Sequence, residues 1–132
     1  MNNLKKYAPI ILRLGFVFVF IWFGLNQLID QSAWVSFIPK SLVTLTGLSA
    51  EMFVIANGVF EIFMASLLAY GIGTRLVASL LFIHMFAIIG DVGLSPIGVR
   101  DVGLMFGLLS LALYGADDLS ITFENKTNES LS

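Results

Sequence analysis

The sequence predicts an all-α integral membrane protein, a four-helix bundle with an interfacial segment between its first two helices. Of the 132 residues, 58% are hydrophobic and 12% are charged, whereas a soluble domain has about 25% charged residues. Four apolar segments, each close to the length that crosses a bilayer, alternate with short stretches rich in glycine, proline and polar residues. A chain of this length forms one domain. We expect this domain to cover residues 1–116, followed by a polar tail at 117–132.

The first predicted helix covers residues 9–29. Pro9 suits the first turn of a helix, where its missing N–H group has no partner in any case. A basic start before an apolar run is typical of a signal peptide, but no small-residue cleavage site follows and the run continues to Ile29. We therefore interpret this segment as an uncleaved helix that spans the membrane.

The segment that follows reads SAWVSFIPKSLVTLTGLS. Trp34, Phe37 and Ile38 cluster on one face, and Pro39 interrupts the helical pattern. These features are typical of an interfacial or re-entrant segment at the membrane surface, with Trp34 in the aromatic belt. An ordinary loop that covers the mouth of the bundle would explain the same residues.

Three more helices are predicted after this segment. The second covers residues 50–70 and ends at GIGT, where Gly71 and Gly73 supply a cap and a tight turn. The third covers residues 74–92 and is followed by GLSP, which breaks the chain. The fourth covers residues 98–115 and is short, so we expect its ends to reach the membrane interface.

The distribution of lysine and arginine predicts the orientation of the bundle. Five of the seven basic residues lie on the side that carries the termini and the second loop, and two lie on the opposite side. The five are Lys5, Lys6, Arg13, Arg75 and Lys126; the two are Lys40 and Arg100. The excess of positive charge on one side favours a multi-pass protein of the plasma membrane with both termini in the cytoplasm.

Polar residues within the predicted spans mark a candidate site, because a charged side chain at the bilayer centre costs about 2.5–3.5 kcal/mol on insertion scales. Glu61 lies near the middle of the second helix, with Asn57 one turn away on the same face. His84 lies at the middle of the third helix, with Asp91 two turns further along. Since Glu61 and His84 lie at equal depth, we expect them to pair inside the bundle.

The outer ends of the other two helices carry further polar residues. Arg100 and Asp101 lie at the outer start of the fourth helix, and Asn26 lies at the outer end of the first. Most polar residues therefore fall in the outer half of the bundle. This distribution predicts a polar pocket that opens to the outside and ends at Glu61 and His84.

Each of these residues also has a purely structural explanation. A core histidine, a protonated Glu61 between helices or an Arg100–Asp101 ion pair would stabilise the bundle without any ligand. Asn57 suits helix packing as well as ligand contact. Arg13, near the inner end, is expected to extend to lipid phosphate.

Several glycines are expected to serve helix packing. Gly103 and Gly107 form a G-x-x-x-G pattern, which lets another helix approach closely. Such packing occurs in a homodimer as well as within one chain. Gly15 and Gly24 have the same capacity in the first helix.

The residue types narrow the chemistry of the pocket. The chain has no cysteine and one histidine, which excludes thiolate chemistry and limits haem binding; we expect no metal site. The chain has no basic patch with interleaved aromatic residues, so the sequence does not predict nucleic-acid binding. A quinone fits best, because a flat apolar ring with two carbonyls needs polar partners and a proton route, which glutamate and histidine supply. A small proton- or ion-coupled transporter or channel would use the same residues, and a purely structural membrane assembly protein is a third alternative.

An ordered set of motifs resembles the DoxX family of small four-helix membrane proteins. The set comprises LRLGFVFVFIWFGLNQL, NGVFEI, the histidine in the third helix and VRDVGL, and it extends over about residues 10–116. The resemblance implies association with membrane redox complexes, since the family is named after a subunit linked to quinone-dependent sulfur oxidation. The residues that match its characteristic positions are Arg13, Gly24, Glu61, Arg100 and Asp101.

One position departs from the family pattern, because many members have lysine where this chain has Gln27. With no cysteine to carry sulfur, a catalytic role in sulfur oxidation does not carry over to this chain. We expect a subunit or scaffold of a membrane redox system that contacts lipids and other redox subunits and binds a quinone or a similar small apolar molecule. The sequence leaves open whether the subunit is itself catalytic. The predicted catalytic residues are Glu61 and His84, and the predicted ligand-binding residues are Asn57, Asp91, Arg100, Asp101 and Asn26.

Overall fold

The computed structural model describes residues 2–121, except for the side chains of residues 2, 91 and 92, and this part of the chain is helical with no strand. Four long helices carry the fold, and short helical turns precede the first and separate the first two. In chain order the elements are α1 (Asn2–Lys5), α2 (Tyr7–Ile29), η1 (Gln31–Ala33), η2 (Val35–Phe37), α3 (Lys40–Thr46), α4 (Ala50–Tyr70), α5 (Thr74–Val92) and α6 (Pro96–Tyr114). The all-α prediction is therefore confirmed for the described part.

Capping residues set the ends of the long helices. The Ser49 hydroxyl accepts from the Met52 N–H at the start of α4, and Gly71 ends that helix in the left-handed conformation at φ 71°. The bounds of α4 and α5 agree with the predicted ranges. The helix α6 begins two residues before the predicted start, because Ser95 caps it and Pro96 fits its first turn.

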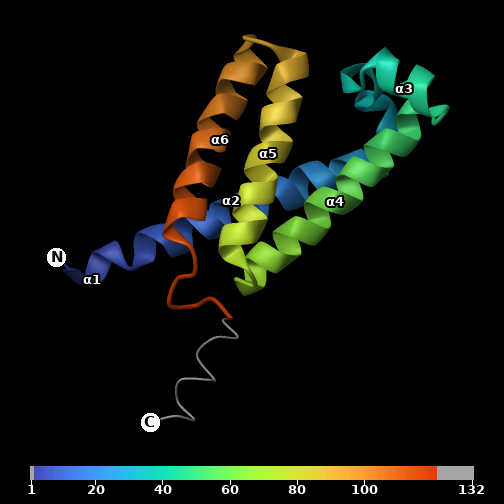
Figure 1. Cartoon of the computed structure of the whole chain (residues 1–132). Coiled ribbons are helices and arrows are strands. Elements are labelled where there is room, and N and C mark those ends of the chain that lie inside the picture. The colour runs from blue at the N-terminus through green and yellow to red at the C-terminus, as the bar shows by residue number, and fades with distance from the viewer. Residues whose placement is uncertain (1, 122–132) are drawn as a thin grey trace.

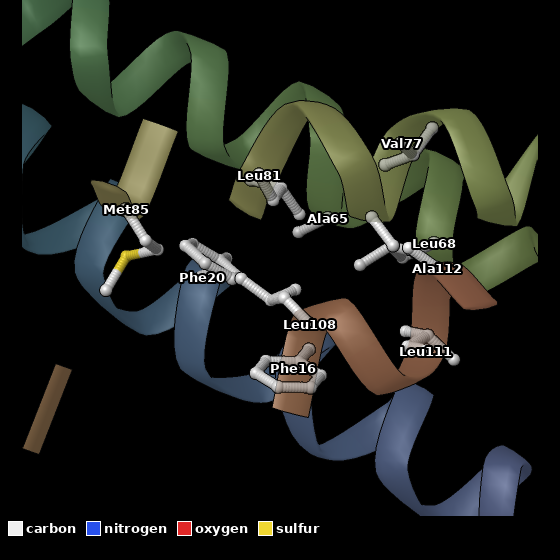
Figure 2. Close-up of a cluster of buried hydrophobic side chains, with 11 residues drawn as sticks. Phe16, Phe20, Ala65, Leu68, Val77, Leu81, Met85, Leu108, Leu111 and Ala112 are labelled. Carbon is white, nitrogen blue, oxygen red and sulfur yellow. The ribbon is translucent and has the colours of Figure 1, made fainter. Parts of the chain in front are cut away.

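The long helices pack as two pairs. The helix α2 packs mainly on α4, α5 packs mainly on α6, and the two pairs cross (Figure 1). A hydrophobic core lies where they meet, with Phe20 of α2, Leu68 of α4, Leu81 of α5 and Leu108 of α6 pointing toward one another (Figure 2). This core holds the pairs together at the crossing point.

Two glycines bring α2 and α4 into backbone contact. A Cβ atom added at Gly24 would lie 2.9 Å from the Gly58 carbonyl oxygen, and one added at Gly58 would lie 2.9 Å from the Gly24 carbonyl oxygen. Gly107 likewise faces the Phe16 ring, whereas a Cβ at Gly15 or Gly103 would meet nothing within 4 Å. Gly24 and Gly107 therefore serve packing within the chain, and Gly15 and Gly103 do not.

The outer surface of the helices is strongly apolar. Phe18, Phe63, Ile83 and Phe106, one from each long helix, are all more than half exposed. Within the described residues, three helical segments, Asn3–Ile29, α4 and α6, are long and apolar enough to cross a membrane, and α5 is apolar over a shorter stretch. A surface of this kind suits lipid, because large apolar patches are rare on soluble monomers.

The segment between α2 and α4 packs over the ends of these two helices. Trp34 anchors it, with its ring centroid 5.6 Å from that of Phe23 and 5.9 Å from that of Phe37. The segment therefore lies against one end of the α2–α4 pair.

The expectation that Arg13 extends to lipid phosphate is wrong. Arg13 is 1% exposed, its Nε donates to Asp117 Oδ2 at 2.7 Å and its Nη2 donates to Asp117 Oδ1 at 3.2 Å. Its Nη1 donates to the carbonyls of Leu68 and Ala69 at the end of α4. The guanidinium remains inside because these carbonyls at the helix end and a carboxylate satisfy it there.

The predicted polar tail begins with this buried aspartate. Burial alone would raise the pKa of the Asp117 carboxyl, but hydrogen bonds from Arg13, the Leu119 N–H and Ser120, with the charge of Arg13, hold the pKa below its ordinary value. The Ile121 N–H donates to the Tyr70 carbonyl at 3.1 Å, which pins the segment to the end of α4. The rest of the tail, including Lys126, lies outside the described residues.

Candidate functional site

A cavity of about 600 Å³ lies between the α2–α4 pair and the α5–α6 hairpin. Figure 1 shows the two pairs diverging toward the α5–α6 turn and α3, and the lining residues come from this side. All four long helices contribute, together with η2 and the chain around Pro39. The wall is mostly apolar, and the polar residues on it are Asn26, Gln27, Asn57, Glu61, His84, Arg100 and Asp101.

Glu61 is the centre of a hydrogen-bond network on this wall. It is 4% exposed, and three side chains surround its carboxylate. Gln27 Nε2 lies 2.8 Å from Oε2, while Asn57 Nδ2 and His84 Nε2 lie 3.2 Å and 3.1 Å from Oε1. The structure thus brings Glu61 and His84 together, as their equal depth in the sequence predicted.

The glycine contact between α2 and α4 positions this network. Gln27 follows Gly24 by three residues and Glu61 follows Gly58 by three, so each lies about one turn from the point of closest approach. With the backbones in contact, the Gln27 amide spans the gap to the carboxylate. Asn57 Nδ2 adds a bond to Gln27 Oε1 at 2.7 Å, which closes a ring of three side chains.

His84 joins α5 to this ring. Its imidazole lies against the Phe60 ring at a centroid distance of 4.9 Å, and 17% of its side chain is exposed. The histidine is therefore partly open, whereas the carboxylate that it contacts is buried. This arrangement links a buried acid to a group that a ligand in the cavity can reach.

Arg100 and Asp101 form a second polar group on the cavity wall. Arg100 Nη2 and Nε lie 3.0 Å and 3.1 Å from Asp101 Oδ1, and the guanidinium lies 5.6 Å from the Phe23 ring centroid. Asp101 is buried, whereas 54% of the Arg100 side chain is exposed. Arg100 therefore connects α6 to α2 at the accessible edge of the cavity through a cation–π contact.

The other predicted site residues have different positions. Asn26 lines the cavity, but its Nδ2 donates to the Trp22 carbonyl of its own helix at 2.7 Å. The side chain of Asp91 lies outside the part of the chain that the structure describes. These two residues are not joined to the Glu61 network by any contact that the structure describes.

Gln27 is the site residue that the sequence analysis did not select. Gln27 is 4% exposed and donates to Glu61. In the sequence it stands at the end of a predicted helix, where a polar residue is expected at the membrane interface. Its spacing of three residues from Gly24 was the available signal, because a small residue marks the face that packs on another helix. The same reasoning would have linked Gly58 with Glu61.

Comparisons with known proteins agree with the family resemblance. The family model for DoxX matches residues 8–94, which include Gln27, Asn57, Glu61 and His84 and end before Arg100. No curated protein and no solved structure matches the chain.

Proposed function

The chain belongs to the DoxX family, and from this premise we propose that it is a subunit or scaffold of a membrane redox system that binds a quinone-type molecule in its cavity. The observation that carries the proposal is the combination of a mostly apolar cavity of about 600 Å³ with a buried carboxylate and a partly exposed imidazole that contact each other on its wall. Small-ligand pockets typically measure about 300–1,000 Å³ and have few polar groups. A quinone head group with an apolar tail has matching chemistry.

The chain is a membrane protein. In the proposed arrangement, four helices span the plasma membrane, namely α2, α4, α5 and α6. The excess of lysine and arginine near the termini supports a cytoplasmic location for both ends. In that orientation the cavity faces outward, and the segment from η1 to α3 lies along the outer interface. Exposed apolar side chains on all four long helices support this arrangement.

The proposed roles follow from position. Glu61 and His84 contact the head group and exchange protons with it, because they adjoin the cavity and contact each other. Arg100 and Asp101 organise the mouth of the cavity. Asn57 and Asn26 contribute polar contacts to the ligand, and Asp91 is proposed for the same role from its place on α5.

Extraction of lipids and quinones from the purified protein tests this proposal. We expect stoichiometric quinone, counted as the oxidised and reduced forms together, with the wild type, none with Glu61→Gln, and the wild-type amount with Glu51→Gln, an exposed glutamate on the same helix. An absence of quinone in all three would refute the proposal. Ion or proton flux in liposomes that Glu61→Gln abolishes would then support a transporter. Loss of stability without any ligand would support a structural assembly protein.

A further inference from the structure

We infer that the polar base of the cavity, formed by Gln27, Asn57, Glu61 and His84, binds hydrogen-bond donors and thus selects the hydroxyl form of its ligand. The ligand class is a hydroquinone or phenol rather than the carbonyl-bearing quinone. This inference rests on the proposed function and deepens it. It follows from counting which hydrogen atoms and lone pairs of the network remain free.

Both amide hydrogens of Gln27 are engaged. Its Nε2 donates to the Phe23 carbonyl at 3.2 Å and to Glu61 Oε2 at 2.8 Å. A carbonyl and a carboxylate can only accept, so these two partners fix which side of the amide carries the nitrogen. Gln27 therefore has no hydrogen left for a ligand.

Both amide hydrogens of Asn57 are engaged in the same way. Its Nδ2 donates to Gln27 Oε1 at 2.7 Å and to Glu61 Oε1 at 3.2 Å. Both partners are oxygens that act as acceptors here, which fixes the orientation of this amide as well. Asn57 therefore offers a ligand only its Oδ1 oxygen.

His84 is the third side chain of the network that contacts the Glu61 carboxylate. His84 Nε2 lies 3.1 Å from Glu61 Oε1, and an imidazole that donates from Nε2 in its neutral form has a lone pair on Nδ1. With amide nitrogens already donating to both carboxylate oxygens, the contacts suit an ionised Glu61 that accepts from all three side chains. His84 Nδ1 is then an acceptor rather than a donor.

The free positions of the network are consequently lone pairs. Glu61 Oε2 and Gln27 Oε1 each accept a single bond, and Asn57 Oδ1 accepts none from the described residues. Since no buried side-chain polar atom in this part of the chain lacks a partner, Asn57 Oδ1 faces open space, and Asn57 lines the cavity. A carbonyl oxygen at this place would face other lone pairs, whereas a hydroxyl group would donate to them.

The rest of the wall favours an aromatic ring as the carrier of that hydroxyl. Phe23, Trp34 and Phe37 line the cavity, Trp34 contacts the other two rings, and all three offer flat apolar surfaces. The Arg100 guanidinium is paired with Asp101 and lies over Phe23. Arg100 and Asp101 together carry no net charge at this edge, so the aromatic wall matches a neutral aromatic alcohol.

Isothermal titration under anaerobic conditions tests the inference on the full chain in detergent. The probes are a hydroquinone, the corresponding benzoquinone and the hydroquinone dimethyl ether, all with the same alkyl tail. We expect the hydroquinone to bind at least about tenfold more tightly than the other two, because only it can donate. Equal or tighter binding of the quinone or the ether would overturn the inference and leave the proposed function intact. Binding of none of the three would refute the proposed function itself.

Two variants locate the selection at the carboxylate. Glu61→Gln replaces an acceptor with a group that can donate, so we expect hydroquinone binding to weaken toward that of the other two probes, while Glu51→Gln leaves the preference for hydroquinone unchanged. Asn57→Ala removes the Oδ1 acceptor but keeps the carboxylate, so we expect the preference for hydroquinone to decrease without being lost, and this variant gives a readout if Glu61→Gln does not fold. An unaltered preference in folded Glu61→Gln, or a lost preference in Asn57→Ala, would contradict the role of Glu61. An alkylammonium ligand that outcompetes the hydroquinone would overturn the choice of an aromatic alcohol.

Discussion

Replacing Asp117 with alanine should destabilise the protein strongly, because it leaves the Arg13 guanidinium buried without its counter-ion. Arg13 is 1% exposed, and two of its four hydrogen bonds to the protein go to Asp117. The remaining two go to carbonyl groups at the end of α4, which carry only partial charge. Breaking a buried ion pair by removing one partner typically costs about 3–5 kcal/mol. We expect Asp117→Ala to lower the free energy of unfolding by about this amount.

Thermal or denaturant unfolding in detergent measures this loss, with Asp118→Ala as the matched control. Asp118 is the neighbouring residue and is exposed, so its removal should change stability by less than about 0.5 kcal/mol. The double variant Arg13→Leu with Asp117→Ala should recover part of the loss, because no buried charge remains. Equal stability of Asp117→Ala and Asp118→Ala would refute the view that Arg13 and Asp117 form a buried structural contact.

Three further predictions concern pH, helix contact and ligand binding. Folding lowers the pKa of the Asp117 carboxyl. Its contribution to the free energy of unfolding is therefore present above the ordinary carboxyl pKa and is lost as the pH falls through the lowered value. In unfolding experiments, the difference in stability between wild type and Asp117→Ala should close below about pH 4. Gly58→Ala should lower the free energy of unfolding by about 1–3 kcal/mol, because the added methyl group forces α2 and α4 apart. Gly103→Ala should be neutral or stabilising, because nothing lies within 4 Å of the added Cβ. The same thermal unfolding assay compares the two variants, and equal effects would contradict the backbone contact. Ligand binding should change the fluorescence of Trp34, which lines the cavity, in a Trp22→Phe background, and an unresponsive Trp34 would argue against occupation of this cavity.

The sequence allowed the helices and one key contact to be predicted because local signals encode them. Gly71 and the break at GLSP define ends of helices, and the bounds of α4 and α5 agree with the predictions. Contact between Glu61 and His84 followed from depth alone, since antiparallel neighbours bring residues at equal depth to the same level. These inferences need only length, spacing and topology.

The rotation of each helix about its axis could not be predicted, because apolar residues face both lipid and core. The partner of Gln27 depends on that rotation, which Gly24 and Gly58 set by their contact. Arg13 and Asp117 are separated by 104 positions, and no periodicity links residues so far apart. Sequence reasoning therefore assigned Arg13 to the lipid surface.

The Arg13–Asp117 pair also has a consequence for biosynthesis. Arg13 leaves the ribosome within α2, whereas Asp117 follows α6, after all four hydrophobic segments have been translated. During insertion α2 thus carries a charge whose partner does not yet exist. The guanidinium has to stay near lipid head groups or water until the last segment arrives. Closure of this contact therefore marks a late step of assembly, and a nascent chain truncated before residue 117 would expose an unpaired arginine to quality control.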